Sequence, residues 1–76
     1  MDRKTFEHEM GRADAFKSEN HDYWMGYQRG LRRQYHENFG TEQEHQLWLT
    51  ADGDESRQQR SQGYRDGFNF TGKEKS

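Results

Sequence analysis

Four residue types are missing from the chain: cysteine, proline, valine and isoleucine. Without cysteine, the protein can form neither a disulfide nor a zinc–thiolate site. Without valine and isoleucine a β-sheet has little to build on, and without proline nothing interrupts a helix. These absences predict an all-α protein of a single domain, a small bundle of three or four short helices.

Aliphatic side chains are also scarce, so the core must be built from aromatic residues together with three Leu, three Met and three Ala. Hydrophobic residues make up 26% of the chain and charged residues 34%, although 14% are aromatic, which argues against a disordered tail. A chain this short buries only about 60% of its unfolded surface. We therefore expect self-association or a partner to complete the fold.

No apolar run approaches the length of a membrane span. The N-terminus, residues 1–4, leads into a charged segment rather than into the apolar region of a signal peptide. The expectation is a soluble cytoplasmic protein without membrane contact.

Two segments repeat the same pattern, Gly-Tyr-x-x-Gly followed by a large apolar residue. On a helix, the two glycines of each segment share one face, and the tyrosine packs on the apolar residue four positions later. Glycine inside a helix costs roughly 1 kcal/mol against alanine, so its use here indicates a close approach of another backbone or ring. The predicted helix-contact residues are Gly26, Tyr27, Gly30, Leu31, Gly63, Tyr64, Gly67 and Phe68. Their glycine faces can meet within one chain, or between two copies in a homo-oligomer.

Capping residues set the expected helix bounds. Thr5 can cap the first helix, Gly40 is a left-handed stop after the second, and Thr41 with Glu44 forms a capping box for the third. Asp54 or Ser56 caps the last one. The expected helices cover residues 5–17, 22–37, 42–51 and 55–69, with a frayed tail over 71–76. Continuity between the first two helices stays open.

Apolar stripes give each helix a buried side. The first helix carries Phe6, Met10, Ala13 and Phe16. The third helix is expected to be anchored by Leu47, Trp48 and Ala51. The last helix has a thin stripe and cannot stand alone.

Catalytic and metal-binding patterns find little support. The four histidines, His8, His21, His36 and His45, lie on different predicted elements. Glu42 and His45 have the spacing found in di-iron bundles, but such a site needs a second copy and further carboxylates. There is no nucleophile elbow and no phosphate-binding glycine loop. We expect no enzyme activity, no metal and no cofactor.

Basic side chains form one arc of the second predicted helix, beside aromatic rings. The residues that could bind a partner or a phosphate are Trp24, Arg29, Arg32, Arg33 and His36. Arginines beside rings suit nucleic acid, but a net charge of -2 and a pI near 6.0 give no long-range attraction to it. The alternative is a solvated arc, or one paired with Glu42, Glu44 and Asp52.

The segment 26–31 and the later Arg60-Ser61-Gln62-Gly63-Tyr64-Arg65-Asp66-Gly67 resemble ribosome modulation factor and its relatives. That resemblance implies a helical hairpin that binds ribosomes, with Arg29, Arg32 and Arg33 as the residues to test. The family is strongly basic, whereas this chain is slightly acidic. The chain also looks similar to small accessory proteins of phages and integrative elements, which often act by binding one host protein.

Taken as a whole, the sequence predicts a non-enzymatic helical binding protein, a protein-interaction or inhibitory module that uses exposed aromatics around Trp24, Tyr27 and Trp48. The second hypothesis is an RNA- or ribosome-associated factor that uses the arginine arc. The third and least favoured is a metal-dependent enzyme built on Glu42 and His45.

Overall fold

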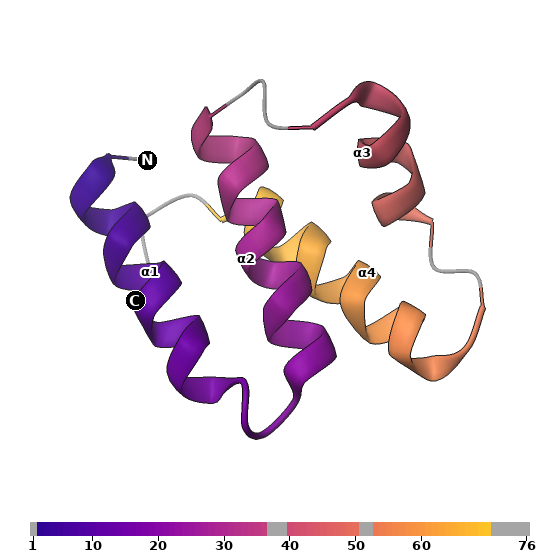
Figure 1. Cartoon of the computed structure of the whole chain (residues 1–76). Helices are drawn as coiled ribbons and strands as arrows, with labels where there is room; N and C mark the ends of the chain where they lie inside the picture. Colours follow the sequence, from indigo (N-terminus) through magenta and orange to yellow (C-terminus); the bar gives the residue numbers. More distant parts are fainter. Residues whose placement is uncertain (1, 37–39, 51–52, 71–76) are drawn as a thin grey trace.

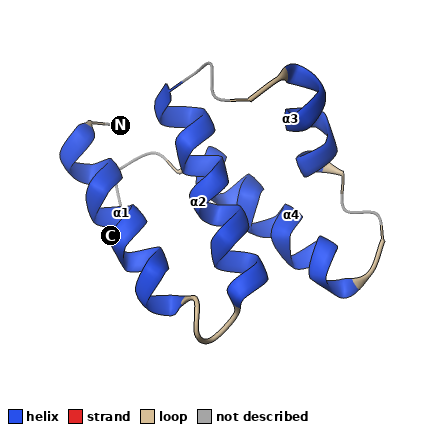
Figure 2. Cartoon of the chain, in the orientation of Figure 1, coloured by secondary structure: helices blue, strands red, loops and turns tan. Residues whose placement is uncertain are grey.

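The computed structural model describes residues 2–36, 40–50 and 53–70. Within these ranges the chain forms four helices and no strand: α1 (Arg3–Phe16), α2 (His21–His36), α3 (Glu42–Leu49) and α4 (Glu55–Phe68) (Figures 1 and 2). The predicted all-α class is confirmed. α1 packs on α2, α2 crosses α4, and α3 lies on the other side of α2 from α1, next to α4 (Figure 1).

The first two helices begin at acceptor side chains that precede them. Asp2 caps α1, because its carboxylate accepts a hydrogen bond from the Thr5 backbone N–H at 2.9 Å. The expectation that Thr5 is the cap was therefore wrong, since an aspartate three residues earlier already serves the first turn. The Asn20 side chain accepts from Tyr23 N–H at 3.1 Å, and the segment 17–20 separates α1 from α2.

The last two helices begin as their sequence signals predict. Thr41 and Glu44 form the reciprocal capping box of α3, and Asp54 rather than Ser56 caps α4. Gly40 has the positive φ of a left-handed residue, +82°. α3 ends at Leu49, two residues before the expected end, and residues 51–52 lie outside the described ranges, as do the predicted end of the second helix at 37–39 and the tail 71–76.

The centre of the molecule is the contact between α2 and α4, where each helix turns its glycines toward the other. A β-carbon on Gly26 would lie 2.0 Å from the Arg60 carbonyl oxygen, and one on Gly30 2.2 Å from that of Tyr64. Real side chains never come so close, so the two backbones touch directly where only glycine fits.

The contact is nearly symmetric. In the reverse sense, a β-carbon on Gly63 would lie 1.9 Å from the Tyr23 carbonyl oxygen, and one on Gly67 2.1 Å from that of Tyr27. Each glycine thus packs against the residue three positions before a glycine of the other helix. Contacts advance in the same direction along both helices, unlike those of the hairpin that the resemblance implied. The chain returns to this direction by crossing over through α3.

On its other side, α2 is covered by α1. Ala13, Leu31 and the Tyr27 ring are buried there, with Phe6 and Met10 packed around them. In the described part of the chain every buried side-chain nitrogen or oxygen has a hydrogen-bond partner; the Tyr27 hydroxyl, for example, donates to Glu9 Oε1 at 3.0 Å. The radius of gyration is 11.9 Å, close to the roughly 11.4 Å of a folded chain of this length. Because the α2 glycines face the α4 backbone and the α4 glycines face the α2 backbone, both glycine faces are occupied within one chain.

Candidate binding surface between α3 and α4

Two arginines of the predicted basic arc point at α3. Arg29 Nη2 lies 3.2 Å from Glu44 Oε1, and Arg33 Nη2 lies 3.2 Å from Glu42 Oε1. Arg33 also donates to the Thr41 carbonyl at 3.1 Å. Of the two alternatives for this arc, the internal pairing with Glu42 and Glu44 is the one that these two arginines adopt. The third acidic residue named for it, Asp52, lies outside the described ranges.

The other members of the predicted set do not join Arg29 and Arg33 in one surface. Trp24 faces α1, with its ring 5.2 Å from that of Phe16 and with the Arg12 guanidinium 5.7 Å from its centre. His36 is exposed and packs edge-on against the rings of Phe6 and Tyr35. Arg32 is half-buried on the side of Asp14, whose carboxylate it helps to stabilise. These residues serve the α1–α2 side of the molecule.

Tyr27 was also placed among the exposed aromatics, and that expectation was wrong. Its side chain is only 5% exposed, because it lies where α1, α2 and α4 meet. Burial, together with the hydrogen bond to Glu9, raises the pKa of Tyr27 to about 12. Tyr27 therefore belongs to the core and is not available to a partner.

α3 is attached to the rest of the molecule mainly through polar contacts, and none of its residues is fully buried. His45 Nδ1 lies 2.5 Å from the Tyr64 hydroxyl, and Ser61 Oγ donates to the Trp48 carbonyl at 2.7 Å. Arg65 donates to the Leu49 carbonyl at 2.6 Å. Burial raises the pKa of Tyr64, so its hydroxyl stays protonated and can donate to His45. The Trp48 ring leans on that of Tyr64, and the Arg29 guanidinium lies 5.3 Å from its centre.

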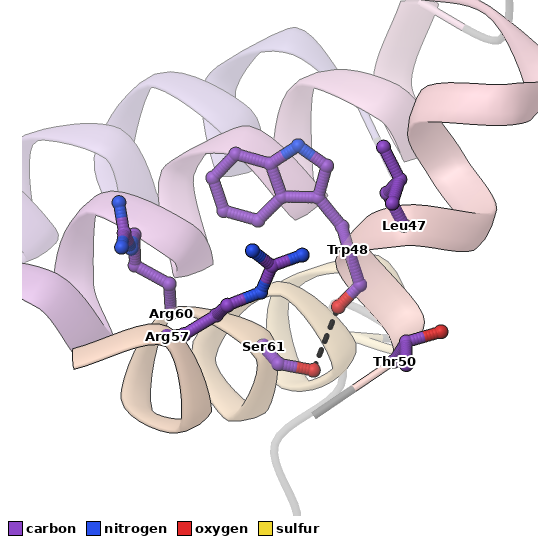
Figure 3. A pocket seen from close by; sticks show the side chains of 6 residues that line it. All are labelled: Leu47, Trp48, Thr50, Arg57, Arg60 and Ser61. Atoms are coloured by element: carbon purple, nitrogen blue, oxygen red, sulfur yellow. Dashed lines mark hydrogen bonds between the residues drawn. The ribbon is translucent and has the colours of Figure 1, made fainter. Parts of the chain in front are cut away.

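A hollow of about 210 Å³ opens between the end of α3 and the first half of α4 (Figure 3). Six residues line it and define what is called here the α3–α4 surface: Leu47, Trp48, Thr50, Arg57, Arg60 and Ser61. The first three come from α3 and its C-terminal cap, and the last three from α4. The Ser61 hydroxyl donates a hydrogen bond to the Trp48 carbonyl, the dashed line in Figure 3, and so joins the two sides of the hollow.

Leu47 is the exposed large hydrophobic side chain of the described part of the chain, at 56%. The expectation that it anchors α3 was wrong. α3 has only about two turns, and Trp48 takes the face toward Tyr64, so the neighbouring Leu47 points elsewhere. A single exposed leucine is common on protein surfaces, so Leu47 is of interest here because it lines the hollow together with the Trp48 ring.

Arginine side chains border the same hollow. Arg57 is exposed, and its guanidinium makes no hydrogen bond or ion pair with any described residue; it extends from α4 toward α3 (Figure 3). Arg60 is loosely held, 3.9 Å from Asp22 Oδ1, while Ser56 donates to the other oxygen of that carboxylate at 2.9 Å. The hollow therefore combines an apolar wall with cationic donors that are not saturated.

Of the six residues that line this surface, Trp48 was named from the sequence as part of a binding surface, and the other five were not. Arg57, Arg60 and Ser61 share one side of α4, at spacings of three and four residues. The sequence contains this spacing, but it does not indicate that α3 packs over the same side of α4.

Two further observations concern sites of other kinds. Among residues 2–36, 40–50 and 53–70, no three histidine, aspartate or glutamate side chains gather as metal ligands, and His45 contacts Tyr64. No helix in these ranges has both the length and the apolar character needed to cross a bilayer.

Known proteins give no guide to the site. No family model, curated protein or solved structure matches the chain.

Proposed function

We propose that the chain is a non-enzymatic binding protein that docks on a protein partner through the α3–α4 surface. The observation that carries this proposal is Leu47, 56% exposed beside a hollow whose bordering Arg57 has no partner among the described residues. Tryptophan and arginine, here Trp48 and Arg57, are enriched at the centre of protein interfaces. An inhibitory or regulatory role would need a surface that docks on another protein, and the α3–α4 surface would supply it.

The runner-up, an RNA- or ribosome-associated factor, receives less support. It relies on Arg29, Arg32 and Arg33, and the first and last of these contact Glu44 and Glu42 on α3. A phosphate would have to displace those carboxylates. The net charge of -2 adds no attraction over distance.

Site-specific photo-cross-linking tests the proposal. A photoreactive phenylalanine analogue replaces Leu47 in one version of the full chain and Lys4, exposed on α1, in the matched control. Both are irradiated in extract of the cells that make the protein. We expect one or a few discrete protein adducts from position 47 that are absent from position 4 and that disappear when Arg57→Glu is added.

Three results would contradict the proposal: equal labelling from both positions, adducts that nuclease removes, or adducts that persist unchanged in the Arg57→Glu background. The first indicates non-specific contact, the second indicates nucleic acid, and the third indicates a surface elsewhere.

A further inference from the structure

The chemistry of the α3–α4 surface indicates which kind of protein segment it takes. We propose that the partner inserts a large apolar side chain into the hollow and places an adjacent carboxylate on Arg57 and Arg60. This inference rests on the proposed function and adds the class of partner to it: an acidic segment that carries a large hydrophobic residue.

The size and the lining of the hollow indicate that the partner segment carries a large hydrophobic residue. The hollow measures about 210 Å³, below the roughly 300–1,000 Å³ of pockets that enclose a whole small molecule. Its apolar wall consists of the Trp48 ring and the Leu47 side chain, one half-buried and the other exposed. One large side chain fits such a space, and covering Leu47 at the same time removes apolar surface from water.

Unsaturated charge selects the acidic part. Arg57 has no partner among the described residues, and the contact of Arg60 with Asp22 is long, at 3.9 Å. Guanidinium groups offer parallel N–H donors that match the two oxygens of a carboxylate, and such charge-assisted bonds are about twice as strong as neutral ones. The two side chains lie one helical turn apart on α4, so they can approach one carboxylate or two neighbouring ones.

A phosphodiester chain would also offer anions, but the surroundings favour a peptide. Beyond Leu47, the outer face of α3 continues with Glu42, Gln43 and Gln46, and the Glu42 side chain is 71% exposed. A long polyanion that crosses Leu47 meets the Glu42 carboxylate and two neutral amides there, with no cationic side chain among these three residues, whereas a short acidic peptide can confine its charge to the side of α4. Charge complementarity is therefore local, on one edge of the hollow only.

The test compares two synthetic peptides that share a central phenylalanine. Aspartates flank it in one peptide, and asparagines of nearly the same shape flank it in the other. Each is titrated into the isotope-labelled full chain, with the Trp48 indole N–H signal as the reporter and the Trp24 signal as the internal control, because Trp24 faces α1. We expect the aspartate peptide to move the Trp48 signal with a Kd about tenfold lower than that of the asparagine peptide, while the Trp24 signal stays in place.

Charge reversal supplies the matched variants. Arg57→Glu should remove the preference for the aspartate peptide, and Arg3→Glu, an equal change of charge on α1, should retain it. Arg57 lies in the first turn of α4, where a glutamate is favourable, so the variant is expected to fold; Arg57→Gln gives the same comparison without a new charge.

Each remaining outcome overturns the inference in a distinguishable way. Equal affinity of both peptides would exclude an acidic partner segment but keep the α3–α4 surface as the binding site. The same holds if neither peptide shifts the Trp48 signal while the cross-link at position 47 still forms. A single-stranded oligonucleotide that moves Trp48 at lower concentration than the aspartate peptide assigns the site to nucleic acid. A Trp48 shift on dilution of the protein alone assigns it to a second copy of the chain. Failure of both the cross-link and the titrations removes the proposed function as well.

Discussion

At the scale of single residues, the α2–α4 contact depends on glycine, because only a residue without a β-carbon lets the two backbones come this close. Each of the four glycines at the α2–α4 contact would place that carbon about 2 Å from a facing backbone oxygen. Backbone atoms cannot give way as the end of a flexible side chain can. Gly11, in α1, provides the contrast, because an added β-carbon there would meet nothing within 4 Å.

Gly63→Ala and Gly11→Ala should therefore change the free energy of unfolding in opposite directions. We expect Gly63→Ala to lower the free energy of unfolding by about 1–3 kcal/mol, since the two helices must move apart. Gly11→Ala should raise it by about 1 kcal/mol through helix propensity alone. Chemical denaturation followed by circular dichroism measures both. Two alanine variants of equal stability would show that α2 and α4 do not touch as described.

Tyr27 makes stability depend on alkaline pH. Its pKa is raised from 10.0 to about 12 in the folded protein, chiefly by burial and then by the hydrogen bond to Glu9. Below about pH 10 the tyrosine is protonated in both states and its contribution is complete. As pH rises from about 10 to 12 the unfolded chain ionises first, so stability falls over that window.

The check is to compare the wild type with Tyr27→Phe. The difference in unfolding free energy between the two proteins should shrink as pH rises through this window. A difference that is constant with pH would mean that the Tyr27 hydroxyl is not buried against Glu9. Tyr23 and Tyr64, whose pKa values are also raised, are present in both proteins and cancel from the comparison.

At the scale of the elements, α3 differs from the other three helices. α1, α2 and α4 each bury residues, whereas α3 buries none and is fastened by Arg29 and Arg33 to its glutamates, by Ser61 and by the His45–Tyr64 pair. Exposed ion pairs are weak and salt-sensitive. We therefore expect the helix that carries half of the proposed binding surface to open more easily than the other three.

Hydrogen exchange should resolve this difference. We expect amides of α3 to exchange faster than those at the α2–α4 contact, and faster still in high salt. Replacing both glutamates with glutamine, Glu42→Gln and Glu44→Gln, should accelerate the exchange of the α3 amides further, since each replacement removes one of the ion pairs that hold α3. Glutamine at position 44 can keep the capping box. The control, Glu7→Gln in the exposed Arg3 pair of α1, should leave α3 unchanged. Equal exchange in all four helices would contradict a weakly attached α3.

The helices could be predicted from the sequence because the residues that start each helix lie within or next to it. The Thr41–Glu44 box lies within four residues, and the Asp54 cap precedes its helix directly. Sequence reasoning placed the cap of α1 at Thr5 because that residue precedes an apolar stripe, although Asp2 offers the better acceptor. It could not place Leu47, because which side of a two-turn helix faces Tyr64 depends on how α3 lies across α4. Pairing of the arginine arc with Glu42, Glu44 and Asp52 was one of the alternatives left open, and Arg29 adopts it with Glu44; nothing in the sequence indicated that the Arg57 side chain is exposed beside the hollow.

At the scale of the whole molecule, the two related segments explain the architecture. Their glycine faces are occupied by each other, so the chain does not need a second copy to cover them. α3 carries the chain from the end of one segment to the start of the next, and it leaves its outer side and the hollow beside Arg57 open. The proposed binding surface is thus a consequence of the crossover that the central contact requires.

That central contact can be observed directly by proton–proton Overhauser effects in isotope-filtered spectra. The position of a β-carbon on Gly63 lies 2.9 Å from the Tyr27 backbone nitrogen, so an α-proton of Gly63 is close to the Tyr27 amide proton. We predict a strong cross-peak between these two protons within uniformly labelled chains. In a mixture of labelled and unlabelled chains, the peak should be absent from the spectrum that selects contacts between different molecules. A missing peak in the first spectrum, or a peak in the second, would contradict a glycine contact closed within one chain.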